Sequence, residues 1–138
     1  MKTLLIVWMW LYPAANAEEN TAASERGSLV LYRRKDYFGA DFTVKINNQL
    51  VTQKFSNNEY LQLEVPAGKV KIDTEGGFIT DKKSMLFSVR ANETVYLKGI
   101  VDYDYLSNAL YFKRTDNEQA AQEIRKTKLD ETALRKIE

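Results

Sequence analysis

The chain has no cysteine and no histidine among its 138 residues. Without cysteine no disulfide can form, so the fold has to be held by its hydrophobic core and its hydrogen bonds. Without histidine or a thiolate, the Ser-His-Asp and Cys-His catalytic arrangements and the common zinc ligand sets are excluded. We therefore expect a protein that is not an enzyme and that carries no metal and no cofactor.

Neither sign of charge dominates the sequence. It has 20 basic and 19 acidic residues, and one of the basic residues, Lys2, lies in a segment that we expect to be removed. Proteins that bind nucleic acid usually present a basic face to the phosphates. The densest basic cluster, Arg33-Arg34-Lys35, is explained by a solvated strand end. The charge balance therefore predicts no nucleic-acid partner.

Long hydrophobic runs are also scarce, and the clearest one stands at the start of the chain. The run Thr3–Leu11 follows a lysine and precedes the small residues Ala15-Asn16-Ala17. This order is typical of a secretory signal peptide, here residues 1–17, cleaved between Ala17 and Glu18. The run is too short for a membrane span, which takes about twenty apolar residues.

The predicted destination is the periplasm or the outside of the cell. Attachment of a lipid would need a cysteine at the cleavage site, and the chain has none. We therefore predict a protein that is released after cleavage, is not a lipoprotein and has no stable membrane insertion. Both tryptophans, Trp8 and Trp10, would leave with the signal peptide.

The pattern after the signal peptide predicts one domain between a leader and a helix. Residues 18–27 are small and charged without periodicity, which predicts a flexible leader. Residues 28–114 alternate apolar and polar residues in short runs rich in Val, Ile, Tyr, Phe and Thr. The fold class that this predicts is all-β, an antiparallel β-sandwich of about eight strands with a C-terminal α-helix. The predicted strands are 29–34, 41–46, 49–55, 59–65, 69–74, 84–90, 94–103 and 109–114.

Two connections between these strands carry clear turn chemistry. Asn47-Asn48 suits a two-residue hairpin, because asparagine tolerates positive φ better than most residues. Pro66-Ala67-Gly68 combines a fixed φ with a flexible glycine, which predicts a chain reversal.

The period changes after the last strand, which predicts a C-terminal helix over residues 115–138. Asp116 or the residue before it can cap the helix. Ala120 and Ile124 lie on one face at helical spacing, whereas Glu131 interrupts that face, so the last turns are expected to fray. We expect the helix to pack on the sandwich, and the alternative is a helix that binds a partner.

Several short segments of the sequence are common motifs when taken singly, but their order and spacing together are more specific for a family. They are Leu31-Tyr32-Arg33, Gly39, Ile46-Asn47-Asn48-Gln49-Leu50, Asn58 with Tyr60, Val65-Pro66-Ala67-Gly68, residues 87–97 and Glu118-Gln119-Ala120-Ala121. Together they resemble a bacterial family of exported domains, domain of unknown function 2846, which is similar to PEGA-type and transthyretin-like β-sandwiches. The chain departs from the pattern at Asn48 and Asn92, where such families often have glycine. The resemblance implies a fold and an envelope location, and it supplies no catalytic residues.

Paired carboxylates are an enzymatic chemistry that the composition leaves open, because glycosidases use two of them. The best local candidate is Asp102-Tyr103-Asp104-Tyr105, with Glu75 and Asp81 as companions from another loop. The alternative, which we favour, is a polar loop between two strands with Tyr103 and Tyr105 packed at the sandwich edge. The ligand spacing of an EF-hand is missing, so we expect no calcium site.

A second loop offers a contact surface. In Glu75-Gly76-Gly77-Phe78-Ile79, two apolar residues follow two glycines, and binding residues often lie on loops that a rigid scaffold holds. The alternative is that this apolar pair anchors the loop in the end of the sandwich. The candidate binding residues are therefore Phe78, Ile79, Tyr103, Asp104 and Tyr105.

The sequence favours an exported, non-catalytic β-sandwich module that binds another cell-envelope component, either a protein or a glycan. A narrower alternative is a periplasmic inhibitor or immunity protein that acts against an envelope-acting toxin or enzyme. A third is a carboxylate-based glycan-active or glycan-binding protein. We expect a monomer or a weak homo-oligomer.

Overall fold

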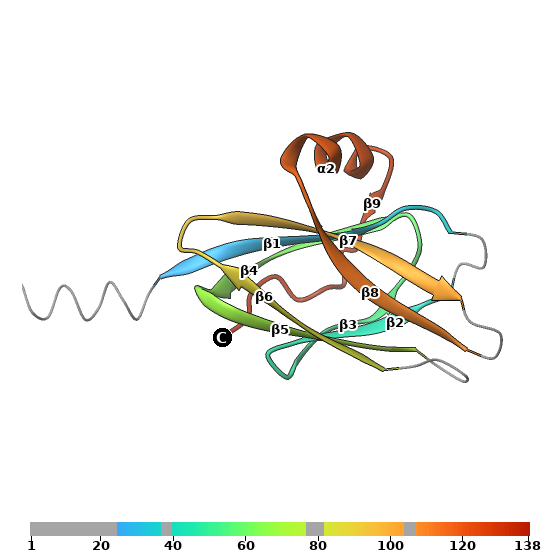
Figure 1. The fold of residues 1–138 in the computed structure, drawn as a ribbon, viewed down its shortest axis with the longest axis horizontal. Coiled ribbons are helices and arrows are strands. Elements are labelled where there is room, and N and C mark those ends of the chain that lie inside the picture. The colour runs from blue at the N-terminus through green and yellow to red at the C-terminus, as the bar shows by residue number, and fades with distance from the viewer. Residues whose placement is uncertain (1–24, 37–39, 77–81, 104–106) are drawn as a thin grey trace, which may run out of the picture.

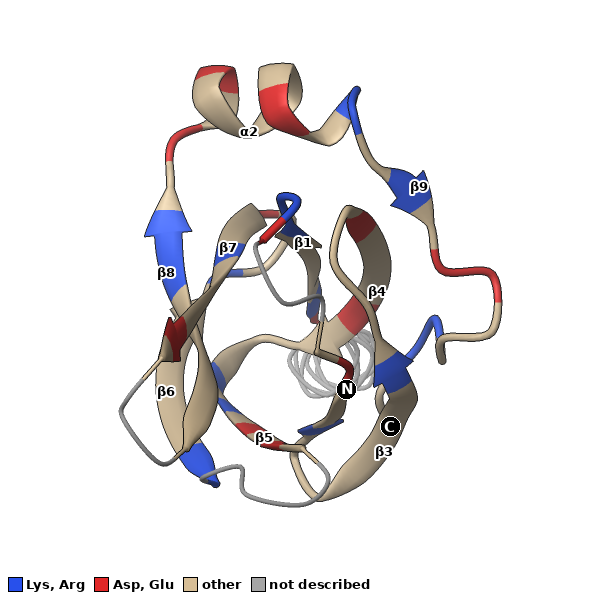
Figure 2. Ribbon diagram, turned by 90° about the vertical axis from the view of Figure 1, so that its right-hand side faces the viewer, with Lys and Arg blue, Asp and Glu red and all other residues tan. Residues whose placement is uncertain are grey.

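The structure, a computed structural model, describes residues 25–36, 40–76, 82–103 and 107–138. In these ranges nine strands form two sheets that pack face to face, and one short helix stands on the outer side of one sheet (Figures 1 and 2). The prediction of an all-β sandwich with a C-terminal helix is confirmed. None of the described helices is long and apolar enough to span a membrane.

Sheet A has the strand order β8-β7-β1-β4-β9, and sheet B has the order β3-β2-β5-β6. The bounds in sheet A are β1 Arg26–Arg33, β4 Glu59–Pro66, β7 Thr94–Tyr103, β8 Asn108–Thr115 and β9 Lys128–Leu129. Those in sheet B are β2 Phe42–Ile46, β3 Gln49–Phe55, β5 Gly68–Gly76 and β6 Lys83–Val89. The helix, α2, spans Asn117–Ile124. All eight predicted strands are present, and β9 is additional.

Sheet A is mixed, which differs from the predicted antiparallel arrangement. β1 runs parallel to β7, with Ser28 beside Thr94 and Arg33 beside Gly99. β9 runs parallel to β4 over two residues. Alternation along a strand shows which side chains are buried and carries no information on the direction of the neighbouring strand. The sandwich was therefore predictable, whereas these directions were not.

The asparagine turns adopt the backbone conformation that the sequence predicts. Asn47 and Asn48 have φ angles of 49° and 66°, as the two central residues of a tight β2–β3 hairpin require. Gly68, with φ of 122°, follows the turn after Pro66. The φ of Asn92 is 63°, so asparagine takes the left-handed conformation at a position where the resembled family often has glycine.

The hydrophobic core lies between the two sheets and consists of the inward residues of their strands. Alternation is clear in β5, where Val70 and Ile72 are fully buried between exposed lysines. On the outer side of sheet A, Val30 and Tyr32 are also buried, and Tyr32 bonds to Glu123 of α2. The main core is formed by residues such as Leu29, Leu31, Phe42, Val44, Ile46, Phe55, Leu61, Leu63, Val65, Leu97, Leu110 and Ile137.

The predicted boundaries of the leader and of the helix are wrong. The strand β1 begins at Arg26, so the last two residues of the predicted leader belong to the sheet. The helix ends at Ile124 and does not continue to residue 138. A continued helix would have turned Glu131 towards the sandwich, whereas an extended path buries Ala133 and fully buries Ile137. The helix itself packs on its own domain, because Ala120 is completely buried.

Residues 128–138, which we call the C-terminal strap, close the open side between the two sheets instead of fraying. Thr52 of β3 donates a buried hydrogen bond of 3.0 Å to Asp130. The strap also bonds to the backbone of β4 and β3, through Lys128 N to Asn58 O (2.9 Å), Asp130 N to Tyr60 O (2.8 Å), Glu64 N to Arg135 O (2.9 Å), Ile137 N to Glu64 O (2.8 Å) and Leu134 N to Val51 O (2.9 Å).

Candidate functional site

The two candidate binding loops are anchored at the same end of the sandwich. β5 ends and β6 begins at this end, and so do β7 and β8, opposite the end where the C-terminus lies (Figure 1). The strands of the two loops also touch, since Thr74 of β5 donates a hydrogen bond of 2.5 Å to the carbonyl oxygen of Leu110 in β8. We call this the loop end. The candidates Phe78, Ile79, Asp81, Asp104 and Tyr105 lie outside the described residues.

Tyr103 is the candidate binding residue that the structure places. It ends β7, and its side chain is 37% exposed. Its hydroxyl donates a hydrogen bond of 3.1 Å to Oδ1 of Asp36. The other oxygen of Asp36 is 2.5 Å from Nη2 of Arg33, in a nearly buried ion pair. Tyr103 is thus linked through Asp36 to a buried cation. This agrees with the interpretation that Tyr103 packs partly at the edge of the sandwich.

Arg33 is buried, which corrects the interpretation of Arg33-Arg34-Lys35 as a solvated strand end. Its exposed fraction is 1%. The guanidinium lies 5.4 Å from the ring centre of Phe42 and 5.8 Å from that of Phe55, so it has two cation–π partners. It donates to the carbonyl oxygen of Ala40 at 2.9 Å and to that of Phe55. A buried charge is tolerated only when it is paired in this way.

Gly99 makes room for this arginine. A Cβ at that position would lie 2.9 Å from Cγ of Arg33 and 3.1 Å from a methyl group of Leu110. The glycine is in β7, beside Arg33 in the parallel register. No sequence signal links these two positions, which are far apart in the chain.

Two of the candidate carboxylates, Asp102 and Glu75, lie within the described residues. Asp102 is exposed on β7 of sheet A. Glu75 lies on β5 of sheet B and is ion-paired with Lys82 at 3.3 Å. Among the described residues, no group of three or more acidic residues could hold a metal ion.

Sequence reasoning missed a polar cluster where α2 meets sheet A. Glu123 of α2 accepts a hydrogen bond of 3.0 Å from the Tyr32 hydroxyl and one of 3.0 Å from Gln119. Its second oxygen is 2.7 Å from Nζ of Lys98. Burial alone would raise the pKa of Glu123, but the hydrogen bonds from Lys98, Gln119 and Tyr32 outweigh it, so the pKa lies below its ordinary value.

The same cluster acts on Tyr32 in the opposite direction. Burial raises the pKa of Tyr32 to about 12, and the neighbouring Glu123 charge adds to this effect, although a hydrogen bond with Thr115 opposes it. A tyrosine with this pKa donates a proton in a hydrogen bond and does not serve as a base near neutral pH. The cluster therefore docks the helix.

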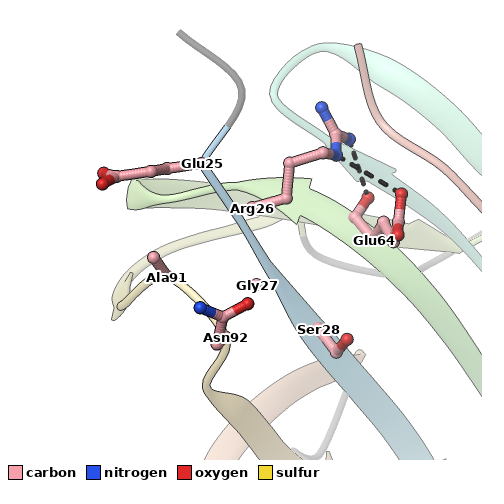
Figure 3. Close-up of a pocket in the computed structure, with 7 residues that line it drawn as sticks. All are labelled: Glu25, Arg26, Gly27, Ser28, Glu64, Ala91 and Asn92. Atoms are coloured by element: carbon pink, nitrogen blue, oxygen red, sulfur yellow. Dashed lines mark hydrogen bonds and ion pairs between the residues drawn. The ribbon is translucent and has the colours of Figure 1, made fainter. Parts of the chain in front are cut away.

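A surface hollow at the opposite end of the sandwich is shown in Figure 3. It surrounds the start of β1, where Arg26 is ion-paired with Glu64 at 3.4 Å and also donates to the carbonyl oxygen of Ile137. A Cβ on Gly27 would lie 2.3 Å from Val89 and 2.7 Å from the carbonyl oxygen of Arg90. The close approach fixes β1 against the β6–β7 turn, so these contacts have a structural explanation.

Comparisons with protein-family models, with curated proteins and with solved structures find no match to this chain. The family resemblance therefore stays a prediction. What the protein does has to be argued from its own residues and geometry.

Proposed function

We propose that the protein is an exported, non-catalytic β-sandwich module that binds another component of the cell envelope through its loop end. The observation that supports this most is the anchoring of both candidate loops at one end of a packed sandwich, with Tyr103 held there by Asp36 and Arg33. A rigid scaffold lowers the entropy that binding loops lose on contact with a partner.

The two ends of the sandwich differ in a way that favours this assignment. The end opposite the loops holds the last residues of the strap and the contacts of Arg26, which use charged groups to fix the chain itself. The loop end carries a partly exposed aromatic residue, and aromatic side chains are enriched where proteins bind partners. Export and the envelope as the compartment rest on the signal-peptide pattern of residues 1–17.

The absence of cysteine allows a sharp test, because a single introduced cysteine is the one thiol of the protein. Asp102→Cys places it at the loop end, and Gln62→Cys places it on an exposed position of β4 as the matched control. Each purified variant is labelled with a photoactivatable maleimide, added to an envelope preparation and irradiated. We expect a discrete crosslinked product from position 102 that is absent from position 62. The mass of the exported protein itself is expected to show that its chain begins at Glu18.

Equal products from both positions, or none from position 102 under several growth conditions, would contradict the proposal. The identity of a captured component distinguishes its versions. A captured enzyme that loses activity on addition of the protein supports an inhibitor, whereas a captured glycan supports glycan binding through Tyr103 and its neighbours.

A further inference from the structure

A second surface feature is a pocket beside the C-terminal end of α2. It is lined by Arg34, Gln122, Glu123, Arg125 and Lys126, and we call it the α2 pocket. Arg34 directly follows β1, and the other four residues come from the end of α2 and the turn that leaves it. In Figure 2 this turn is the blue segment between α2 and β9.

The α2 pocket has more positive than negative charge. Three of its lining residues, Arg34, Arg125 and Lys126, are cations, and its one acidic residue is Glu123. Glu123 is already used, because it is ion-paired with Lys98 at 2.7 Å and, at the longer distance of 3.8 Å, with Nε of Arg34. The helix end contributes a negative partial charge of about one half, which lowers the excess without cancelling it.

Arg34 also has a donor atom without a partner. Its Nη1 is buried and makes no hydrogen bond to any described residue, although the side chain as a whole is 32% exposed. A buried donor that lacks an acceptor is costly and is rare in folded proteins. Because Arg34 lines the α2 pocket, a rotation of its side chain would bring this donor to an anion held there.

We propose that the α2 pocket binds a phosphate group. A phosphate carries between one and two negative charges at neutral pH and several acceptor oxygens, which matches a site with three cations and an unused guanidinium donor. Arginine binds phosphate through two parallel N–H donors, and Arg34 and Arg125 both provide this fork. The carboxylate of Glu123 stays on Lys98 and Tyr32, so that it holds α2 in place while the cations bind.

The first experiment is an NMR titration of the purified protein with inorganic phosphate at low salt. We expect saturable shifts of the backbone amide signals of Arg34, Gln122, Arg125 and Lys126. Arg34→Gln is expected to weaken binding at least tenfold, whereas Arg135→Gln, an exposed arginine on the strap, is the matched control and is expected to leave the affinity unchanged. Arg125→Gln, at an exposed position, serves as the second variant if Arg34→Gln fails to fold.

The proposal would be overturned if the shifts do not saturate, or if Arg34→Gln and Arg125→Gln both bind phosphate as tightly as the parent. Either result would indicate general ionic screening and not a binding site. The source of the phosphate is tested with vesicles of phosphatidylglycerol and of phosphatidylcholine. Binding to the first alone, and its loss in Arg34→Gln, would identify a lipid headgroup. Saturable binding of inorganic phosphate without vesicle binding would identify a soluble phosphate group.

Discussion

At the scale of single residues, β1 carries two buried polar side chains that point to opposite faces of sheet A. Arg33 points into the interior, where aromatic rings and backbone carbonyls hold it, and Tyr32 points to the other face, towards α2. Alternation along β1 predicts that neighbours face opposite ways. Alternation alone does not predict that a charged residue such as Arg33 is buried at an inward position.

The first residue-scale prediction concerns Arg33→Met. This change keeps much of the side-chain volume but removes the donors that Arg33 supplies to Asp36 and to two carbonyl oxygens. We expect the free energy of unfolding to fall by about 3 kcal/mol, as when one partner of a buried ion pair is removed. Urea unfolding measures it, with Arg135→Met as the exposed control, expected to change stability by less than about 0.5 kcal/mol. A loss for Arg33→Met no larger than that of the control would refute the structural role.

The second residue-scale prediction concerns alkaline pH. Because the pKa of Tyr32 is raised from 10.0 to about 12, the folded protein keeps a proton that the unfolded chain releases. The corresponding stability is complete below pH 10 and is lost as the pH rises towards 12. Tyr32→Phe has no hydroxyl to titrate, so its stability is expected to decline less than that of the parent over this range.

The measurement is the urea midpoint at several pH values above neutrality, taken for both proteins. Tyr111→Phe, which leaves the Tyr32 cluster intact, is the matched control and is expected to follow the parent. Parallel curves for the parent and Tyr32→Phe would show that Tyr32 does not keep its proton in the folded state.

At the scale of elements, the strap takes the place of the predicted last turns of the helix. The start of that prediction is confirmed, since Asp116 caps α2 through a bond of 2.8 Å from Gln119 N. The remainder failed because the strap buries Ile137 in a gap between β3 and β4 that exists only once both sheets are assembled. Helical periodicity, read over a local window, holds no information on that gap.

The element-scale prediction compares two apolar residues of the strap. Ile137 is fully buried, whereas Leu134 is 40% exposed. We expect Ile137→Ala to lower the free energy of unfolding by about 2 to 5 kcal/mol, because it leaves a cavity in the core. Leu134→Ala should cost less than about 1 kcal/mol, since little of its burial is lost. Both are measured by urea unfolding, and equal losses would show that the strap does not close the core.

At the scale of the whole molecule, the fold depends on contacts between distant parts of the sequence. β1 pairs with β7, the strap binds β3 and β4, and α2 is fixed by Tyr32. Contacts of this kind require loop closure before they stabilise anything, which slows folding. The two sheets share one core, so they are expected to unfold together.

The whole-molecule prediction is therefore a single cooperative transition with folding in the range of about milliseconds to seconds. Stopped-flow circular dichroism measures the rate, because both tryptophans lie in the predicted signal peptide. Hydrogen exchange measures cooperativity, with β4 and β5 expected to show the same opening free energy. Folding within microseconds, or separate opening of the sheets, would contradict this view.

The candidate site was predictable from the sequence only where it depends on local pattern. The sequence singled out Tyr103 by its place in a loop rich in aromatic and acidic residues, and the structure places it, partly exposed, on Asp36. It did not indicate Arg33, Glu123 or the α2 pocket. Those depend on which strand lies next to β1 and on where the helix ends.

The sequence by itself determined eight of the nine strands, the asparagine turns, the cap of α2 and the exclusion of histidine and cysteine chemistry. The last of these follows from composition, and the others depend on residues close together in the chain. The tertiary structure alone decided the parallel pairing of β1 with β7, the path of the strap, the burial of Arg33 and the cations around α2. The physical reason is that burial and pairing energies belong to contacts between distant segments, which a local pattern of apolar and polar residues cannot specify.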